Sequence, residues 1–213
     1  MTIAVIGHGR SPEGKSWGSR IDVCSTVVRC WDWHWQHPRD FGYQYHYGLF
    51  VLTPRNFRLF SEHNQRRPER GWLVYLGKPT SCHLPDSSQL VDTTRWCDLG
   101  RALGGQGLSG GFTLTRGCAM AAWAIEHAGK GEEVILVGFD NVLCGINKPI
   151  EESFCPEYWA MQSLYWDEKK TDKIYPVGEA KTATHDMSVE KPLLEALASS
   201  NNVPLKFAQE VWE

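Results

Sequence analysis

Residues 3–29 of the chain read IAVIGHGRSPEGKSWGSRIDVCSTVVR. The apolar and largely β-branched run Ile3–Ile6 predicts a short buried strand. The turn that follows contains Gly7, His8 and Gly9, and glycine allows backbone N–H groups to come close to a ligand. The stretch therefore predicts the first strand of an α/β sheet with a ligand-binding turn at its end. Short glycine patterns are common, so the same residues also fit a generic strand, loop and helix unit.

Further along the chain, short apolar runs alternate with helical patterns. Ser11, Pro12 and Glu13 supply a capping hydroxyl, a proline and an acid, which together predict a helix start. Further strands are predicted at residues 25–29, 49–52, 72–76 and 133–140, with an irregular region or a set of short elements at 77–111. We expect a single α/β domain over residues 1–213, with a Rossmann-like, mostly parallel sheet of about five to seven strands flanked by helices.

The overall composition excludes several classes of protein. The chain has 213 residues and a formal net charge of −3, which argues against a uniformly basic nucleic-acid-binding protein. No run reaches the roughly 18 to 20 apolar residues that span a bilayer, and no leader pattern is present, so we expect a cytoplasmic protein without membrane contact. The seven cysteines contain no CxxC pair, which favours free, buried thiols over a zinc or redox site.

Aromatic residues alternate in two neighbouring segments, Trp31, Trp33 and Trp35, and then Tyr43, Tyr45 and Tyr47. In an extended segment this alternation places three rings on one face. Such a face could stack on sugar rings or bases, or it could form a buried aromatic layer. The histidines at 34, 37 and 46 match no common zinc-ligand spacing, so we expect no metal there.

Positive charge is concentrated in Arg55, Arg58, Arg66, Arg67 and Arg70. These arginines could meet the phosphates of a small donor or of a polymer acceptor. They could equally form the solvated face of a helix.

Residues 110–140 form a second unit of the same kind as the first. Thr115, Arg116 and Gly117 lead into an apolar helix over 118–128, and a buried strand then ends at Gly138 and Asp140. Doubly wound sheets bind nucleotides where a helix N-terminus lies beside a strand C-terminus. The two units therefore predict one shared cleft.

In this arrangement the chain resembles the sialyltransferases of glycosyltransferase family 29. Residues 3–29 are similar to the long sialyl motif of that family, including Ser16-Trp17-Gly18 and Ile21-Asp22. Residues 115–139 are similar to the small motif, with three extra residues near 129–131. His185 and Glu190 have the HxxxxE spacing of the very small motif. The motifs occur in the family's order.

The chain also differs from the family pattern. His8 and Trp31 stand where the long motif has asparagines, and the histidine of the third motif has no counterpart after Leu164. The cysteine pair that joins the long and small motifs in secretory-pathway members is missing, which agrees with a reducing cytosol. We therefore expect a divergent, short cytosolic relative of viral or bacterial origin.

The resemblance implies a GT-A variant fold, a CMP-sugar donor and an inverting displacement by an acceptor hydroxyl. It makes His185 the general base, because imidazole titrates near neutral pH. Asp186 or Glu190 could orient the ring, although Glu190 could instead cap a helix or pair with Lys191. The residues expected to bind the donor are Gly7, His8, Gly9, Arg29, Trp31, Thr115, Arg116, Gly117, Gly138 and Asp140.

The sequence contains no Asp-x-Asp pair, the usual means of holding Mg²⁺ or Mn²⁺ against a sugar diphosphate. The single phosphate of CMP can be bound by backbone N–H groups, a helix N-terminus and Arg116 or Arg10. We therefore expect a metal-independent enzyme without a cofactor.

Two other functions remain open at this stage. A transferase could use another sugar nucleotide on a modified base of phage DNA, which the arginines and aromatic residues would suit. A catalytically silent module that binds nucleotides or glycans would account for the missing third-motif histidine. The acceptor, a glycan or a nucleic acid, and the oligomeric state are also open.

Overall fold

The structure of the chain is a computed structural model that describes residues 1–29, 37–52, 66–76, 87–146, 178–182 and 184–213. Side chains are described for all of these residues except 50–52 and 75–76. Trp31, Trp33, Trp35, Arg55, Arg58 and the segment after Leu164 lie outside the described residues.

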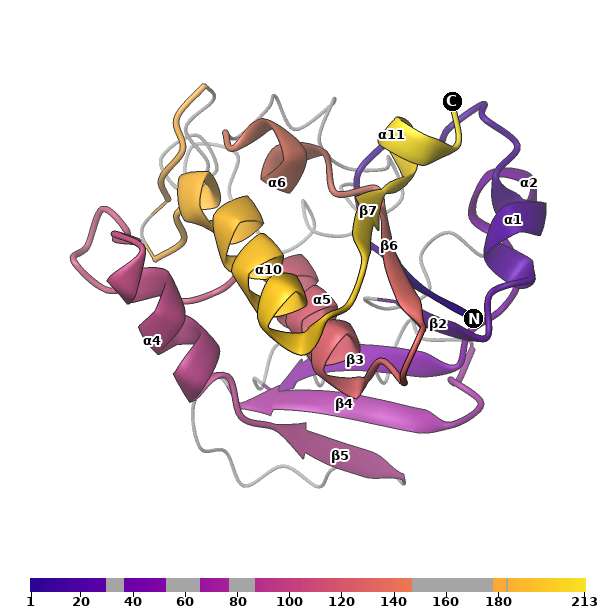
Figure 1. Cartoon of the computed structure of the whole chain (residues 1–213), viewed down its shortest axis with the longest axis horizontal. Helices are drawn as coiled ribbons and strands as arrows, with labels where there is room; N and C mark the ends of the chain where they lie inside the picture. The colour runs from indigo at the N-terminus through magenta and orange to yellow at the C-terminus, as the bar shows by residue number, and fades with distance from the viewer. Residues whose placement is uncertain (30–36, 53–65, 77–86, 147–177, 183) are drawn as a thin grey trace.

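The described strands form one sheet in the order β5-β4-β3-β2-β1-β6-β7 (Figure 1). They are β1 (Thr2–Ile6), β2 (Thr26–Arg29), β3 (Tyr47–Leu52), β4 (Gly71–Leu76), β5 (Ser88–Val91), β6 (Glu133–Val137) and β7 (Leu205–Phe207). All six pairings are parallel, which confirms the predicted α/β class and sheet type. A sheet of parallel strands needs helical cover on both faces.

Helices supply this cover. They are α1 (Gly18–Asp22), α2 (Pro38–Phe41), α4 (Thr94–Ala102), α5 (Arg116–His127), α6 (Asp140–Cys144), α10 (Met187–Asn201) and α11 (Ala208–Val211). In Figure 1, α4, α5 and α10 lie together on one side of the sheet, while α1 and α2 lie at its other side.

The alternation of side chains along β1 divides the core in two. Ile3 and Val5 belong to the larger cluster, which includes the apolar faces of α5 and α10. Ala4 and Ile6 belong to the smaller one, with residues of α1, α2 and α11. Successive side chains of a strand point to opposite faces, so a strand buried on both faces reads as a continuous apolar run. The described elements therefore form a three-layer sandwich, with β1 in the interior of the sheet between β2 and β6.

The strands predicted from apolar runs are confirmed at β1, β2, β3, β4 and β6. The helix start predicted at Ser11 is wrong, because residues 11–15 form turns and the first helix begins at Gly18. Gly14 (φ 74°) and Ser16 (φ 58°) adopt left-handed conformations that end any helix there. The region 77–111 contains β5 and α4, as a set of short elements would.

The tyrosine part of the predicted aromatic platform is not formed. Tyr43 is 62% exposed, but Tyr45 is buried and meets Trp72 edge-on, with ring centroids 6.1 Å apart. Tyr47 packs against Trp123 at 5.1 Å. The chain is not extended between Pro38 and Tyr47, so the three rings do not share a face.

Two arginines of the predicted basic patch, Arg66 and Arg70, bind the protein itself, whereas Arg67 is exposed. Arg66 donates a hydrogen bond to the carbonyl of Tyr43, and Arg70 donates to Thr26 Oγ1 and the carbonyl of Ser25. These bonds connect the segment before β4 to the start of β2 and to the segment between α2 and β3.

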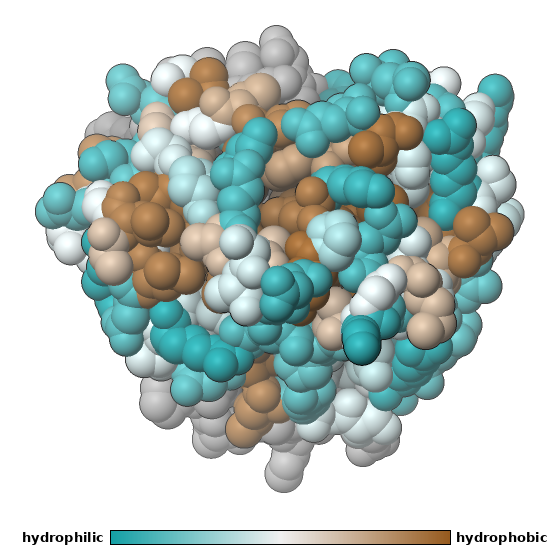
Figure 2. Space-filling model, in the orientation of Figure 1, coloured by the Kyte–Doolittle hydropathy of each residue, from teal (hydrophilic) through white to brown (hydrophobic). Residues whose placement is uncertain are grey.

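Figure 2 shows the face over α4, α5 and α10 as mostly hydrophilic, with its hydrophobic residues in separate groups. No helix among the described residues is long and apolar enough to cross a membrane.

The cysteines of the described part of the chain, Cys24, Cys97, Cys118 and Cys144, are free thiols. All but Cys144 are buried, as the sequence predicts.

Candidate functional site

The strand order places the switch point of the sheet at the carboxyl ends of β1 and β6. From β1 the chain builds the sheet outward through β2 to β5, and it then returns to the other side of β1 with β6 and β7. The chain therefore leads from β1 to α1 on one face of the sheet and from β6 to α6 on the other, while the two loops touch where they leave their strands. In open α/β sheets, ligands bind in the crevice at this switch point. The sequence-predicted residues from Gly7 to Gly9 and from Gly138 to Asp140 lie there.

The glycines after β1 pack against the end of β6. The Gly7 N–H donates to the Val137 carbonyl at 2.8 Å, and the Gly9 N–H donates to the Gly138 carbonyl at 2.9 Å. A Cβ on Gly7 would lie 2.5 Å from the Gly138 oxygen. These two N–H groups, which the sequence predicts to approach a ligand, instead hold the loop on β6. That Gly7 and Gly9 belong to a donor-binding loop stays a prediction, with these two N–H groups engaged inside the protein.

Asp140 also holds this loop. Its side chain is 7% exposed, and Oδ2 accepts a hydrogen bond from the Ser11 N–H at 3.0 Å. Oδ1 accepts one from Gln209 Nε2 at 2.8 Å, and the same Nε2 lies 2.7 Å from Ser11 Oγ. The carboxylate is thus engaged inside the protein, and we reassign Asp140 from donor contact to loop support. No pattern around Gln209 in the sequence points to this role.

Arg29 has a structural role as well. Its side chain is fully buried, with Nε donating to the Gln44 carbonyl at 2.8 Å and Nη2 to the Phe41 carbonyl at 2.6 Å. Nη2 also reaches the Gly42 carbonyl at 3.2 Å. A buried guanidinium with these partners supports the segment after α2. This placement corrects the prediction that Arg29 binds the donor.

The N-terminus of α5 lies beside the switch point. Thr115 is its N-cap, with Oγ1 accepting from the Cys118 N–H at 3.2 Å, and Arg116 is the first helical residue. A Cβ on Gly117 would be 3.2 Å from the Phe139 ring, so glycine there keeps α5 close to the end of β6. The positive end of the α5 dipole and the charge of Arg116 thus lie together at the start of the helix, which suits an anion.

Glu190, on α10, is tied to the same N-cap. Its fully buried carboxylate accepts hydrogen bonds from the Thr115 N–H at 2.6 Å and from Thr115 Oγ1 at 2.7 Å. Burial raises the pKa of Glu190 to about 7, against the opposing effect of the two hydrogen bonds. Glu190 therefore links the starts of α5 and α10 by bonding to the N-cap of α5, which is close to the predicted capping role. The structure shows Lys191 paired with Glu210.

His185 is oriented by a backbone carbonyl. Its Nδ1 lies 2.9 Å from the Thr113 carbonyl oxygen and 3.3 Å from Thr113 Oγ1. A carbonyl only accepts, so Nδ1 carries the proton and Nε2 holds the lone pair. The backbone of His185 is bonded to Thr182, with its N–H donating to Thr182 Oγ1 at 2.9 Å. Thr113, which no sequence pattern indicated, thus selects the tautomer of His185 and leaves Nε2 able to accept a proton.

Asp186 caps α10 and does not contact the ring of His185. Oδ1 accepts from the Ser188 N–H at 3.2 Å, and Oδ2 accepts from the Gln106 N–H at 3.1 Å. Lys181 Nζ lies 3.5 Å from Oδ2. The expected orientation of His185 by a carboxylate is therefore corrected, because both candidate carboxylates are bonded elsewhere.

Arg116 acts electrostatically on two imidazoles of the site. Burial, followed by the charge of Arg116, lowers the pKa of His8 to about 3. Burial also lowers the pKa of His185, opposed by the bond to Thr113 and assisted by Arg116. The ring nitrogens of His8 are buried, although the residue as a whole is partly exposed. At neutral pH the site therefore combines one fixed cation with two neutral histidines.

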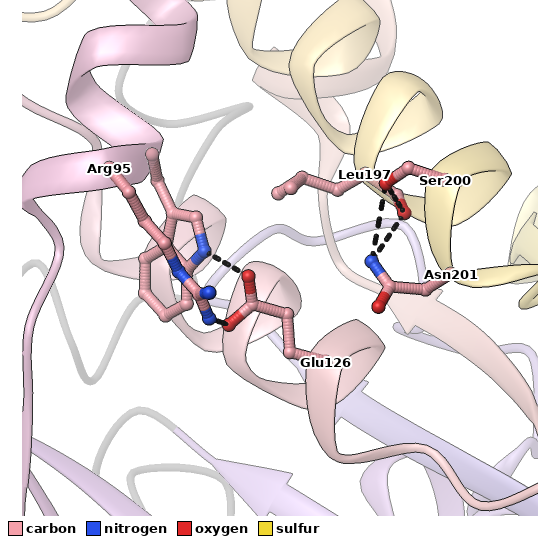
Figure 3. Close-up of a pocket in the computed structure, with 6 residues that line it drawn as sticks. Arg95, Glu126, Leu197, Ser200 and Asn201 are labelled. Carbon is pink, nitrogen blue, oxygen red and sulfur yellow. Dashed lines mark hydrogen bonds and ion pairs between the residues drawn. The ribbon is translucent and has the colours of Figure 1, made fainter.

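A separate cavity of about 400 Å³ lies between α4 and the C-terminal ends of α5 and α10 (Figure 3). Its lining residues are Arg95, Trp96, Glu126, Leu197, Ser200 and Asn201. Glu126 is ion-paired with Arg95 and accepts a hydrogen bond from Trp96 Nε1 at 2.8 Å. Asn201 ends α10 and His185 precedes it, so at 1.5 Å per residue the cavity is about 20 Å from His185. It is not the predicted site.

Among the described residues, no group of three or more His, Cys, Asp and Glu side chains could hold a metal ion. The cation of this site is Arg116, at the start of α5.

The chain was compared with known proteins. No protein-family model matches the sequence, and no curated protein matches it either. The crystal structure of a mammalian sialyltransferase aligns with a TM-score of 0.53 and 15% identity, covering 96% of this chain and 68% of that one. The fold is sialyltransferase-like. A mammalian sialyltransferase in complex with Gal-beta-1-3GalNAc-ortho-nitrophenol aligns with a TM-score of 0.52 and 14% identity over the same shares.

Within this sialyltransferase-like fold, the predicted residues separate into two groups. His8, Thr115, Arg116, Gly117, His185 and Glu190 are connected to the starts of α5 and α10 by the contacts and charges described above. Gly7, Gly9, Gly138 and Asp140 hold the loop after β1 against β6. Arg29 supports another segment, and Trp31 lies outside the described residues.

Proposed function

We propose that the protein is a glycosyltransferase that moves a sialic acid-like sugar from a CMP-sugar to an acceptor hydroxyl, with inversion and without a metal. One observation carries this proposal: in a sialyltransferase-like fold, the Thr113 carbonyl fixes the tautomer of His185, and the charge of Arg116 at the start of α5 lowers the pKa of the same imidazole. The proposed partners are a nucleotide-sugar donor and a glycan or nucleic-acid acceptor. The protein is proposed to work in the cytoplasm, with neither cofactor nor membrane.

The proposed chemistry follows from the two ends of the site. His185 Nε2 takes the proton of the acceptor hydroxyl as that oxygen bonds to the anomeric carbon. The bond from the anomeric carbon to the phosphate oxygen breaks, and CMP leaves with the electron pair. Arg116 and the N–H groups at the start of α5 stabilise the negative charge of the leaving phosphate. The Nδ1–H bond to Thr113 stabilises the imidazolium that forms.

Nucleotide binding is the first test. The purified protein is melted with CMP, CDP, UDP or GDP, where a ligand at a hundred times its dissociation constant adds about 2.7 kcal/mol of stability. For a domain of this size that is a rise of about 5 to 10 °C in melting temperature. A rise with CMP alone supports the donor class. A preference for a diphosphate contradicts it.

The role of His185 is tested in the next step. His185→Ala should abolish transfer from a CMP-sugar while CMP still raises the melting temperature. His127→Ala is the control, because His127 is exposed at the other end of α5. A protein that binds CMP and shows no turnover in its natural form would be a silent binding module.

A further inference from the structure

The short helix α11 packs on the loop that follows β1. The Trp212 ring meets the Trp17 ring edge-on, with centroids 5.6 Å apart, and Arg20 Nη1 donates to the Trp212 carbonyl at 3.3 Å. Lys15 and Glu213 form an ion pair of 2.9 Å. Residues 208–213 are thus joined at several points to residues that precede and form α1, and so to the loop that begins at Gly7.

Gln209 makes the contact closest to the site. Its Nε2 donates to both Ser11 Oγ and Asp140 Oδ1. Its Oε1 is buried and accepts no hydrogen bond from any residue that the structure describes. This arrangement fixes which way the amide faces, because the opposite orientation would place Oε1 against the Asp140 carboxylate. The amide therefore donates to the two groups that hold the loop after β1.

The buried carboxylate of Asp140 depends on this donor. It has two described hydrogen bonds, one from the Ser11 backbone and one from Gln209. Without Gln209, Oδ1 would lose its donor while remaining buried, which is costly for a charged group. The carboxylate would turn or draw in water, and Ser11 would move with it. Gly9 would be displaced as well, since it lies close enough that a Cβ would be 2.6 Å from Oδ2.

We propose that Gln209 is a positioning residue for the nucleotide site: through Asp140 and Ser11, α11 holds the loop after β1 in the shape that binds the donor. This inference rests on the proposed function, since it takes CMP as the ligand of the cleft. Gln209 itself does not touch the donor. Its effect is on the position of residues 7–11 at the carboxyl end of β1.

The test measures CMP affinity by calorimetry at a temperature well below every melting transition. Gln209→Glu places a carboxylate against Asp140 and should weaken CMP binding by about tenfold, the effect of losing one charge-assisted hydrogen bond. Gln89→Glu is the matched control, because Gln89 is exposed on β5, at the far edge of the sheet. It makes the same chemical change and should leave CMP affinity unaltered.

A double variant separates positioning from general damage. Combining Gln209→Glu with Asp140→Asn exchanges the amide and the carboxylate, so the bond between the two side chains re-forms with its direction reversed. The CMP affinity of the double variant should be within about threefold of that of the natural protein, compared with the tenfold loss in Gln209→Glu alone.

Each outcome is decisive. Weakened binding with Gln209→Glu and recovery in the double variant support the inference. If the natural protein binds CMP and Gln209→Glu binds it equally well, the positioning role is refuted while the proposed function stands. Loss of affinity that the double variant does not recover also refutes it, since damage rather than the lost bond is then the cause. If the natural protein does not bind CMP, the proposed function fails and the inference fails with it.

Discussion

Replacement of Glu190 by Gln should make the protein less sensitive to alkaline pH. In the natural chain the carboxyl group is fully buried, and its pKa rises from the ordinary 4.5 to about 7 on folding. Between these two values the folded state holds a proton that the unfolded state has released. Stability is then lost as the pH rises from 4.5 through 7, because unfolding is accompanied by proton release.

The size of the effect follows from the two pKa values. Each pKa unit corresponds to about 1.4 kcal/mol, so the difference between 4.5 and about 7 corresponds to about 3.5 kcal/mol at most. About 2 to 3 kcal/mol of this falls between pH 5 and pH 8. Gln resembles the protonated acid: its oxygen can accept from the Thr115 N–H, and its amide can donate to Thr115 Oγ1.

The assay is chemical denaturation of both proteins at pH 5 and pH 8. Relative to the natural protein, Glu190→Gln should gain about 2 to 3 kcal/mol of unfolding free energy between the two pH values. Glu195→Gln is the control, because Glu195 is exposed on the same helix. Taking the difference between variants removes the contributions of His8 and His185. An unchanged or reversed difference for Glu190→Gln would refute the argument, and would mean that the buried carboxylate is stabilised in its charged form.

Three further predictions concern the cleft and its supports. Arg116→Gln should weaken CMP binding by about tenfold. It should also move the acid limb of the pH–rate profile to higher pH, because the charge of Arg116 lowers the pKa of His185. An acid limb that does not move would contradict this electrostatic link between the two residues. EDTA should leave transfer from a CMP-sugar unchanged, and an EDTA-sensitive rate restored by Mg²⁺ or Mn²⁺ would contradict the metal-free mechanism. Arg29→Leu should lower the free energy of unfolding, measured by chemical denaturation, by about 2 to 4 kcal/mol, since it leaves buried carbonyls without donors. A change in CMP affinity without this loss of stability would indicate that Arg29 binds the donor.

Much of the framework was predictable from local pattern. The runs that form β1, β2, β4 and β6 are apolar because each strand is buried on both faces, and that burial leaves a signal within a few residues. Helix α5 has the same kind of local signal, with Thr115 as a capping residue and glycines after its end. The short β7 and α11 have no comparable signal. Their stability comes from packing against β6 and α1.

The roles of the site residues were harder to predict than their presence. Asp140 and Gly9 were expected to face the donor because they follow strands in a nucleotide-type pattern. In the folded chain they face each other, since the loops after β1 and β6 pack together. A sequence pattern shows that a residue lies at a strand end, but it does not show which neighbour occupies its hydrogen-bonding groups.

The sequence by itself therefore determined the class of fold, the buried strands and the start of α5, because hydrophobic period and capping act over a few residues. His185 was singled out by its resemblance to a family motif. Only the tertiary structure decided the partners. Thr113 and His185 are 72 residues apart, Thr115 and Glu190 75, and Asp140 and Gln209 69. Each pair meets because of the order of the strands and the packing of the helices. The first five strands extend the sheet to one side of β1, β6 is added on the other side, and α10 packs against α5. Hydrogen bonds of this kind depend on the geometry of the whole sheet, and no local pattern encodes them.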